Sequence, residues 1–492
     1  MGGISRRRFL GAAGAAVVLP SLAESASAAR GKVNVLFIAV DDLRPQLNCY
    51  GHGQMISPNI DRLAREGLLF ERTYCQQAVC APSRASVLSG LRPDSTRIYD
   101  LNTPLRKALP DVLSLPQHFR NSGYETLSIG KIYHHPNDDQ EGWSAAPFRA
   151  GTFPEGKWKG RGYITQEAIE QMNEYTSEMP NSEGRGPAYE AADVPDNYYP
   201  DGANTDHAIA ELRRLKGEGR PFFMAMGFYK PHLPFNAPKK YWDLYPREEI
   251  RLADNPFLPK DCPSYAPTDW GELRNYYGIP KKGPLSDDLA RTLIQAYYAC
   301  VSYMDAQVGR LLEELDRLDL RRNTVVILWG DHGWKLGEHS LWSKHTNFEL
   351  DTRVPMIASA PGGRGGVRTS ALTEFVDIYP SICELAGVAV PAHCEGTSFV
   401  PLMGKPDRPW KSAAFSQYPR GKVMGYTMRT ARWRYTEWQE RSSGRIMARE
   451  LYDHDADPAE NANVAAAEDM KGTVAELSAM LKAGWRAARP KT

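Results

Sequence analysis

The sequence has few cysteines, almost no net charge and no long apolar run, and each shortage argues against a class of protein. Seven cysteines in 492 residues are too sparse, and odd in number, for a secreted scaffold held together by disulfides. A formal net charge of +1 gives no basis for binding nucleic acid or an anionic membrane surface, so any anion site must be local. No stretch after the first thirty residues could cross a bilayer as a stable helix.

The N-terminus predicts an export signal. Three arginines at positions 6–8 precede a small-residue and apolar stretch, and Ala26-Ser27-Ala28 fits an A-x-A cleavage site. The motif that begins at Ser5 resembles the twin-arginine signal, which the Tat translocon reads. A basic disordered leader is the alternative. We expect a periplasmic or secreted protein, and because no cysteine follows the apolar stretch, we expect no stable membrane anchor.

The order of apolar and polar segments predicts an α/β fold. Buried parallel strands are predicted where an apolar run ends in polar residues, at 33–42, 126–131, 222–232 and 324–332. Helical spacing follows at 57–67, 114–123, 286–318 and 376–387. We therefore expect a large, mainly parallel mixed sheet sandwiched by helices.

The composition divides the chain into a leader at 1–28, a catalytic domain at 31–404 and a C-terminal subdomain at 405–492. The last part alternates strand-like segments and ends in one helical segment, which predicts a small antiparallel sheet with one helix. Residues 135–205 and 233–284 are rich in Pro, Gly and Asp with weak periodicity, so we interpret them as long loops at the strand ends.

Charged side chains gather where the predicted strands end, which is where open α/β sheets bind ligands. One acidic pair alone would be read as a helix cap and a solvated charge. Three carboxylates that converge from two strand ends must bind a cation or lose charge. Their oxygens suit Ca²⁺ or Mg²⁺, while the histidine leaves room for Zn²⁺ or Mn²⁺. The candidates are Asp41, Asp42, Lys131, His232, Asp331 and His332.

Cys80 lies in the stretch QQAVCAPSRASVLSG, at the start of a predicted helix. Pro82 suits the first turn of that helix, and the free N–H groups there form a seat for an anion. Arg84 adds a permanent positive charge. Position 80 is therefore suited to attack on an anionic centre, although a bare thiolate would be repelled by the carboxylates and by an anionic substrate.

The pattern Cys80-x-Pro82-x-Arg84, followed by ASVLSG and RPD, resembles the signature of the sulfatase family. The segments VDDLRPQLNCYG, TRIYDLN, GKIYHHP, YKPHLPF and DHGWKLGEHSLWSKHTNFE are similar, in order and spacing, to the iduronate-2-sulfatase branch. The resemblance implies an alkaline-phosphatase-like fold. It also implies hydrolysis of sulfate monoesters through formylglycine, which a formylglycine-generating enzyme makes from Cys80.

The resemblance also implies a role for each candidate. Asp41, Asp42, Asp331, His332 and an oxygen of modified Cys80 would hold the metal. Arg84 and His134 would orient the formylglycine, Lys131 and Lys344 would clamp the sulfate, and His232 would protonate the departing alcohol. The alternatives are ordinary ones: the lysines could be surface residues, the neighbouring His135 could replace His134, His232 could only fix a loop, and His339 could be structural.

The substrate is less well specified. The branch implies a 2-O-sulfated uronate at the end of a glycosaminoglycan-like chain, while other sulfated polysaccharides and choline sulfate stay open. A phosphonate or phosphodiester hydrolase and an inactive sulfated-glycan-binding protein are alternative functions, and a Cys383–Cys394 pair is a further open point. The candidates for a sugar-binding rim, each of which could instead be core, are Tyr99, Asp100, Asn102, Trp329, Trp334 and Trp342.

Overall fold

The computed structural model describes residues 1–2, 32–134, 138–151, 162–182 and 184–491. The predicted export signal lies outside these residues, apart from its first two positions. Residues from Val33 onward form one compact unit, and the following description concerns this unit. Among the described residues, no helix has the length and apolar character of a membrane span.

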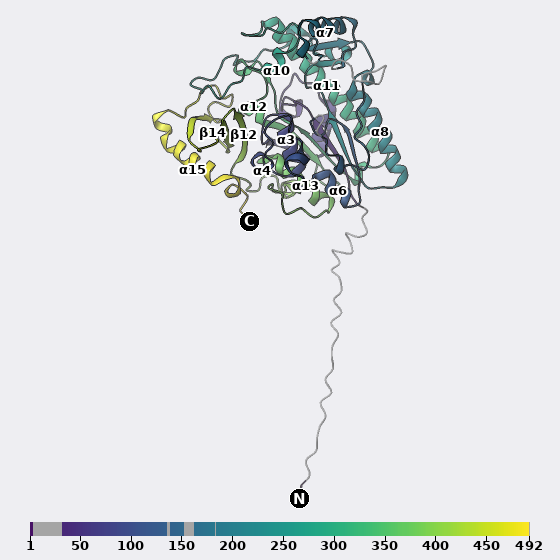
Figure 1. Ribbon diagram of the computed structural model, residues 1–492. Coiled ribbons are helices and arrows are strands. Elements are labelled where there is room, and N and C mark those ends of the chain that lie inside the picture. The colour runs from purple at the N-terminus through teal and green to yellow at the C-terminus, as the bar shows by residue number, and fades with distance from the viewer. Residues whose placement is uncertain (3–31, 135–137, 152–161, 183, 492) are drawn as a thin grey trace. The chain divides into compact units, whose positions relative to one another are not determined.

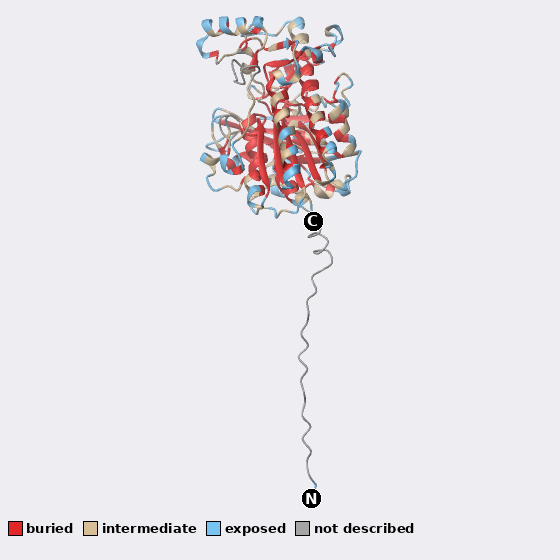
Figure 2. Cartoon of the chain, turned by 90° about the vertical axis from the view of Figure 1, so that its right-hand side faces the viewer, coloured by how far each residue is buried: buried red, intermediate tan, exposed pale blue. Residues whose placement is uncertain are grey.

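A seven-stranded mixed sheet forms the centre of this unit, with strand order β11-β2-β10-β7-β1-β5-β3. The four strands from β7 to β3 are parallel, and β10 runs antiparallel to both of its neighbours. Figure 2 shows that most of the sheet is buried, and β1, β3, β5 and β7 are buried at every residue. The strands are β1 (Asn34–Val40), β2 (Leu68–Tyr74), β3 (Glu125–Gly130), β5 (Phe222–Phe228), β7 (Thr324–Gly330), β10 (Arg353–Ser359) and β11 (Val367–Glu374).

Helices cover both faces of this sheet, as the alternation of segments predicted (Figure 1). Leu36, Ile38 and Val40 of β1 belong to one apolar cluster, which they share with α2, α8 and α11. Their neighbours along the strand point to the opposite face and belong to a second cluster, shared with α3, α6 and α13. These helices are α2 (Pro58–Glu66), α3 (Cys80–Ser89), α6 (Leu115–Asn121), α8 (Pro200–Glu218), α11 (Asp287–Arg317) and α13 (Ile378–Ala386).

The C-terminal part forms the predicted antiparallel sheet, with strand order β12-β13-β14-β15, and one long helix (Figure 1). Buried ion pairs join it to the rest of the unit: Lys411 binds Asp377 at 2.6 Å, and Arg434 donates to Glu349. The elements are β12 (Ala414–Arg420), β13 (Val423–Arg429), β14 (Trp433–Glu440), β15 (Ile446–Asp453) and α15 (Lys471–Ala487).

The two regions interpreted as long loops contain regular structure, which corrects that prediction. Residues 166–178 form a helix whose N-cap, Thr165, accepts a hydrogen bond from the backbone of Ala168. This helix buries only Ala168 and Tyr175, and the other elements have four residues each, so their periodicity is weak in the sequence. They are α7 (Gln166–Glu178), β4 (Tyr189–Ala192), β6 (Phe235–Pro238), α9 (Lys239–Trp242) and α10 (Gly271–Arg274).

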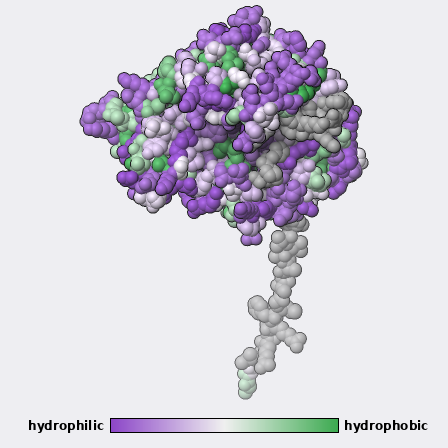
Figure 3. All heavy atoms as spheres, turned by 45° about the horizontal axis from the view of Figure 1, so that its top comes forward, coloured by the Kyte–Doolittle hydropathy of each residue, from purple (hydrophilic) through white to green (hydrophobic). Residues whose placement is uncertain are grey.

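The remaining short elements complete the connections around the sheet. They are α4 (Pro93–Thr96), α5 (Leu105–Ala108), β8 (Lys335–Leu336), β9 (Trp342–Ser343), α12 (Glu349–Thr352) and α14 (Val400–Gly404). All seven cysteines are free, so Cys383 and Cys394 are not paired. The face turned forward in Figure 3 is largely hydrophilic, with scattered apolar side chains, as expected for a surface in contact with water.

Candidate active site

The strand register brings the two acidic pairs to one edge of the sheet. Val40 of β1 lies opposite Gly330 of β7, so the next residues, Asp41 and Asp331, leave their strands at the same level. The backbone N–H of Asp331 donates to Val40 at 3.0 Å, and that of Asp42 donates to Asp331 Oδ1 at 3.0 Å. The carboxyl groups therefore converge, as expected for the ends of parallel strands.

The converging groups suit a divalent cation. Donor atoms of Asp41, Asp42, Cys80 and His332 lie within 4.8 Å of one another, and all four side chains are buried. His332 Nδ1 is 3.0 Å from the carbonyl of Gly333, which places the ring proton there. Its other nitrogen, Nε2, faces Asp42 Oδ1 at 3.4 Å. Nε2 is thus the ring atom that could act as a metal ligand beside the carboxylates.

The two adjacent carboxyl groups at the end of β1 differ in acidity. Burial raises the pKa of Asp42 to about 7, although Lys344 opposes this effect. Burial acts on Asp41 as well, but Lys131, His232 and Arg84 outweigh it and hold the pKa of Asp41 well below its ordinary value. Asp41 is thus compensated by protein cations, whereas Asp42 needs further positive charge to stay ionised at neutral pH.

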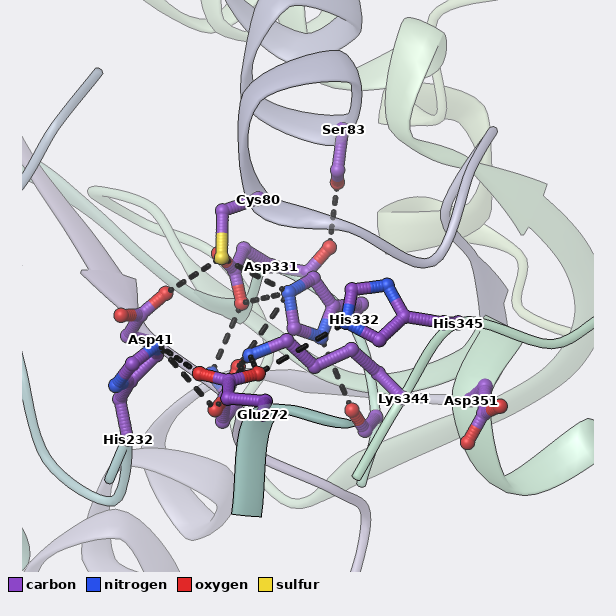
Figure 4. A network of polar contacts seen from close by, with 12 residues as sticks. Asp41, Cys80, Ser83, His232, Glu272, Asp331, His332, Lys344, His345 and Asp351 are labelled. Carbon is purple, nitrogen blue, oxygen red and sulfur yellow. Dashed lines mark hydrogen bonds and ion pairs between the residues drawn. The ribbon is translucent and has the colours of Figure 1, made fainter. Parts of the chain in front are cut away.

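Cys80 is the first residue of α3, and its side chain points into this acidic cluster (Figure 4). Its Sγ lies 3.2 Å from His332 Nε2 and 3.5 Å from Asp41 Oδ1. Burial, and then the charge of Asp41, raise the pKa of the thiol well above its ordinary value. Cys80 as encoded is therefore a neutral thiol and a weak nucleophile.

Arg84 connects the two acidic strand ends one turn into α3. Its Nε donates to Asp331 Oδ2 at 2.8 Å, and its Nη2 donates to Asp41 Oδ1 at 3.2 Å. Its Nη1 donates to the backbone carbonyl of Ile132 at 2.9 Å, and the guanidinium is fully buried. Arg84 thus fixes the positions of both carboxylates relative to the helix that carries Cys80.

The two predicted sulfate-binding lysines are buried in the same cluster, and neither is a surface residue. Lys131 Nζ donates to Asp41 Oδ2 and lies 3.7 Å from Cys80 Sγ. Lys344 Nζ lies 3.0 Å from each oxygen of Asp42. Burial lowers the pKa of each lysine, but the neighbouring carboxylates outweigh it and raise both values, so both side chains stay charged.

The two predicted histidines have different surroundings. His232 Nδ1 lies 2.6 Å from the carbonyl of Leu233, and its Nε2 lies 3.9 Å from Asp42 Oδ2, so Nε2 faces the cluster. His134 is half-buried, and its Nδ1 has no hydrogen-bond partner among the described residues. Burial, and then the charge of Lys131, lower the pKa of His134 to about 3, so its ring is neutral at physiological pH.

Glu272, on α10, belongs to this network and was missed by the sequence reasoning. Its Oε1 lies 3.0 Å from His232 Nε2, and its Oε2 lies 2.8 Å from Lys344 Nζ (Figure 4). It comes from the weakly periodic region 233–284, where one acidic residue among several carries no signal in a single sequence. Lys335 was also missed; it pairs with Asp351 at 2.6 Å, and both side chains are fully buried.

The predicted rim residues divide into two groups. Asp100 and Asn102 are exposed, and Asp100 accepts hydrogen bonds from the backbone of Asn102 and Thr103, which shapes their loop. Trp334 is fully buried, and Lys344 Nζ lies 4.8 Å from its ring centre. The rim position expected for Trp334 is therefore corrected, because the ring packs beneath Lys344 and does not face solvent.

The other aromatic candidates and His339 are likewise placed. Trp329 is fully buried and Trp342 nearly so, which agrees with the core alternative. Tyr99 is half-buried, and its hydroxyl donates to Asp94 at 2.9 Å. His339 is buried, with its Nε2 2.8 Å from the carbonyl of Ala459, which is a structural contact with the C-terminal part.

Residues 33–388 match the family model described as sulfatase, a region that includes every member of the cluster. The chain belongs to the sulfatase family. Residues 337–486 also match the model described as N-sulphoglucosamine sulphohydrolase, C-terminal. The family model and the similarity to iduronate 2-sulfatase identify the chain as a sulfuric ester hydrolase.

Individual sulfatases and their structural relatives resemble the chain over nearly its whole length. Iduronate 2-sulfatase of Mus musculus is 35% identical over 533 residues, which covers 91% of this chain and 93% of that protein. A structure in complex with its substrate D-glucosamine-2-N,6-O-disulfate has a TM-score of 0.72 at 21% identity, with coverage of 92% and 97%. Phosphonate monoester hydrolase from Silicibacter pomeroyi has a TM-score of 0.71 at 22% identity, with coverage of 94% and 96%.

Proposed function

We propose that this sulfatase removes sulfate from sugar residues of polysaccharides, with a 2-O-sulfated uronate as its preferred substrate, and that its nucleophile is formylglycine made from Cys80. The observation that carries the proposal is the position of Cys80, at the start of α3 with its Sγ 3.5 Å from Asp41 and 3.7 Å from Lys131. The similarity to iduronate 2-sulfatase supports the choice of sugar.

The surroundings of Cys80 favour a hydrated aldehyde over a thiol. The buried thiol is neutral and faces carboxylates, so it would be a weak nucleophile toward an anionic ester. A formylglycine-generating enzyme would oxidise Cys80 to an aldehyde, and water would add to it. The resulting carbon carries two neutral hydroxyl groups, one to attack sulfur and one to release the product.

The residues of the cluster divide the work of the reaction. One hydroxyl gives its proton to a carboxylate of the cluster and attacks sulfur, and the sulfur–oxygen bond to the sugar breaks. The imidazolium form of His232 protonates the leaving sugar oxygen from Nε2, and the proton held by the carboxylate later restores that form. The other hydroxyl then loses its proton while the carbon–oxygen bond to sulfate breaks. This step releases hydrogensulfate and restores the aldehyde, which water hydrates again. Arg84 and His134 orient the group at position 80.

Positive charge in the site matches the charge of the ester. Lys131 and Lys344 are buried and charged, so they would bind the sulfate oxygens with fixed positive charge. Asp41, Asp42, Asp331 and His332 would hold a divalent metal ion, with Ca²⁺ as the proposed ion because most donors are carboxylate oxygens. The bound ion would supply further positive charge for sulfate oxygens and for ionisation of the nucleophile.

We also propose that the protein is exported in its folded state through the twin-arginine route, after the formylglycine has formed in the cytoplasm. The proposal rests on the sequence around Arg6 and Arg7 and on the A-x-A pattern that ends at Ala28. It is tested by fractionating cells that express the chain or an Arg6→Lys, Arg7→Lys variant. The variant should be retained in the cytoplasm, and equal export of both chains would contradict the proposal.

The experiment that tests the function combines mass spectrometry with turnover. Protein coexpressed with a formylglycine-generating enzyme should lose the thiol mass in the peptide that spans Cys80 and should release sulfate from a 2-O-sulfated uronate. Cys80→Ala should fold but release no sulfate. Turnover by a preparation in which the thiol is unchanged would contradict the mechanism.

A comparison of substrates tests the two alternative functions. Faster cleavage of an aryl phosphodiester or phosphonate than of an aryl sulfate would favour a phosphonate hydrolase. This alternative is tested because the fold is similar to that of the phosphonate monoester hydrolase from Silicibacter pomeroyi. Binding of sulfated glycans by fully modified protein with no sulfate release would favour an inactive glycan-binding protein. Release of sulfate from uronate 2-O-sulfate, and not from glucosamine 6-O-sulfate, would support the sugar we propose.

A further inference from the structure

Glu272 places a negative charge across two groups that the proposed reaction needs for its substrate. Its two carboxylate oxygens contact different partners, His232 Nε2 at 3.0 Å and Lys344 Nζ at 2.8 Å. Burial raises the pKa of Glu272, but Lys344 and His232 outweigh it and hold the value well below the ordinary range, so the group is ionised. Figure 4 shows the carboxylate between these two side chains.

The contacts of His232 cannot all persist during the reaction. Its Nδ1 is engaged by the carbonyl of Leu233 at 2.6 Å, so Nδ1 keeps its proton and Nε2 can deliver one only from the doubly protonated ring. Burial lowers the pKa of His232, and the charges of Asp41 and Glu272 oppose that effect. Nε2 is also the atom that Glu272 contacts. A ring nitrogen carries one proton along one direction, so Nε2 cannot donate fully to Glu272 and to a leaving sugar oxygen together.

Lys344 leads to the same conclusion. An ammonium group has three N–H donors, and the structure gives this one three acceptors: both oxygens of Asp42 at 3.0 Å and Oε2 of Glu272 at 2.8 Å. A sulfate oxygen can take a donor only if one acceptor leaves. Glu272 is 19% exposed, whereas Asp42 is fully buried, so Glu272 is the acceptor on the side open to solvent.

The backbone that carries Glu272 is anchored. Trp270 and Leu273, which lie on either side of it in the sequence, are both buried, and the guanidinium of Arg274 stacks 3.3 Å from the centre of the Trp270 ring. A carboxylate displaced from His232 and Lys344 therefore stays in the wall of the site. There it adds a repulsive term for each negative charge on a bound ligand.

We propose that Glu272 is a specificity-determining residue whose carboxylate occupies the sulfate position in the free protein, is displaced by the substrate, and disfavours ligands that carry a second negative charge. The inference rests on the proposed function, because it assigns His232 and Lys344 to the ester. It predicts selection of sulfate monoesters, which carry one negative charge, over phosphate monoesters, which carry two near neutral pH.

The test compares the metal-loaded enzyme with its Glu272→Gln variant, which keeps the size of the side chain and removes the charge. Inorganic sulfate, measured by isothermal titration calorimetry, should bind about tenfold more tightly to the variant, because a charge-assisted pair no longer competes. The KM for an aryl sulfate should fall, with kcat changed by less than about threefold. The ratio of aryl phosphate to aryl sulfate turnover, as kcat/KM, should rise about tenfold.

Two further variants keep the result interpretable. Glu248→Gln removes the same charge from an exposed residue. It should leave the affinity for sulfate, the KM for an aryl sulfate and the phosphate-to-sulfate turnover ratio unchanged. Glu272→Ala, checked for folding by thermal unfolding, should reproduce the sulfate result. Sulfate that binds to the Glu272 variants with equal or lower affinity, or a fall in kcat at constant KM, would overturn the inference in favour of a positioning role. Wild-type protein that neither binds sulfate nor cleaves any sulfate ester would instead refute the proposed function.

Discussion

Arg84 Nε donates to Asp331 Oδ2 at 2.8 Å, with both side chains fully withdrawn from solvent. This pair joins the helix that begins with Cys80 to the end of β7, and the same guanidinium reaches Asp41. Arg84 therefore holds the two acidic strand ends in place and also contributes positive charge to the site. A lysine could supply the charge but not the forked set of donors.

The first prediction concerns this pair. Arg84→Lys should lower the free energy of unfolding by roughly 3–5 kcal/mol, because it leaves buried acceptors on Asp331 and Asp41 unpaired. Urea unfolding of the two proteins measures the difference. The control is Arg62→Lys, in a partly exposed pair with Glu66 at 2.7 Å, where the change should be below about 1 kcal/mol. Equal losses of unfolding free energy in both variants would show that Arg84 does not hold α3 to the end of β7.

The second prediction concerns the leaving group. His232→Gln should lower kcat for a sugar sulfate by about 10²–10⁴, because an alkoxide leaves slowly without a proton donor. An aryl sulfate should lose much less, since a phenolate leaves without protonation. The measurement is the ratio of the two losses in parallel assays. A loss of the same size on both substrates would mean that His232 acts on binding or on position 80, and not on the departing oxygen.

The third prediction concerns metal removal. Chelation should abolish sulfate release and lower the midpoint of thermal unfolding, because Asp42, beside Asp41, is buried with too little positive charge around it. Added Ca²⁺ should restore both properties, and comparison with Mg²⁺ and Zn²⁺ identifies the preferred ion.

The control for metal removal uses another cluster of possible ligands, Glu349, His454 and Glu460. Arg434 already neutralises this group, with Nε 2.6 Å from Glu460 Oε1. A Glu460→Gln variant should therefore keep the full response to chelator, whereas Asp331→Asn should lose most of it. If Glu460→Gln lost the response to chelator and Asp331→Asn kept it, the metal would bind at Glu349, His454 and Glu460, and the prediction would be wrong.

Much of the fold and of the cluster could be predicted from the sequence, because both depend on strands that end in charged residues. A continuous apolar run such as Val35–Val40 indicates a parallel strand, and parallel neighbours bring their carboxyl ends to one edge. The positions of Asp41 and Asp331 follow from that rule. The register of the strands, which the sequence does not give, brings these two residues to the same level of the sheet edge.

The residues that could not be predicted depend on contacts between distant segments. Glu272 reaches the site from a four-residue helix with no periodicity to mark it, and only the packing of Trp270 and Leu273 directs it inward. Trp334 was misplaced because composition cannot tell a stacking platform from a core aromatic. Lys335 and Asp351 neutralise each other inside the protein, which the separate residues do not signal.

The fourth prediction follows from the corrected position of Trp334. Trp334→Leu should weaken the binding of inorganic sulfate and lower stability by about 1–3 kcal/mol, because Lys344 loses the ring beneath it and the core loses volume. Selectivity among sulfated sugars should stay the same, since the ring is fully buried. Parallel kcat/KM measurements on uronate 2-O-sulfate and glucosamine 6-O-sulfate check this, and a changed ratio would return Trp334 to the sugar-binding rim.

The fifth prediction is a pH dependence at the junction with the C-terminal sheet. Glu374 is buried; burial raises its pKa, but Arg92 at 2.7 Å and Lys411 at 2.7 Å outweigh it and lower the value to about 2. A carboxyl group whose pKa is lower in the folded state stabilises the protein above its unfolded pKa, near 4.5. That stabilisation, about 3 kcal/mol, is lost as the pH falls from about 4.5 to about 2.

The measurement is the unfolding free energy of wild type and Glu374→Gln between pH 3 and pH 7. The variant should be less stable at pH 7, and the difference in unfolding free energy should narrow as the pH falls below about 4.5. In that range the unfolded wild-type chain binds a proton at Glu374 that the folded protein does not bind, so only the wild type loses this stabilisation. The control, Glu71→Gln, removes an exposed partner of Arg368 and should give a small gap at every pH. A gap between wild type and Glu374→Gln that stays constant across this range would show that the loss comes from packing, and that the charge of Glu374 does not tie the two sheets together.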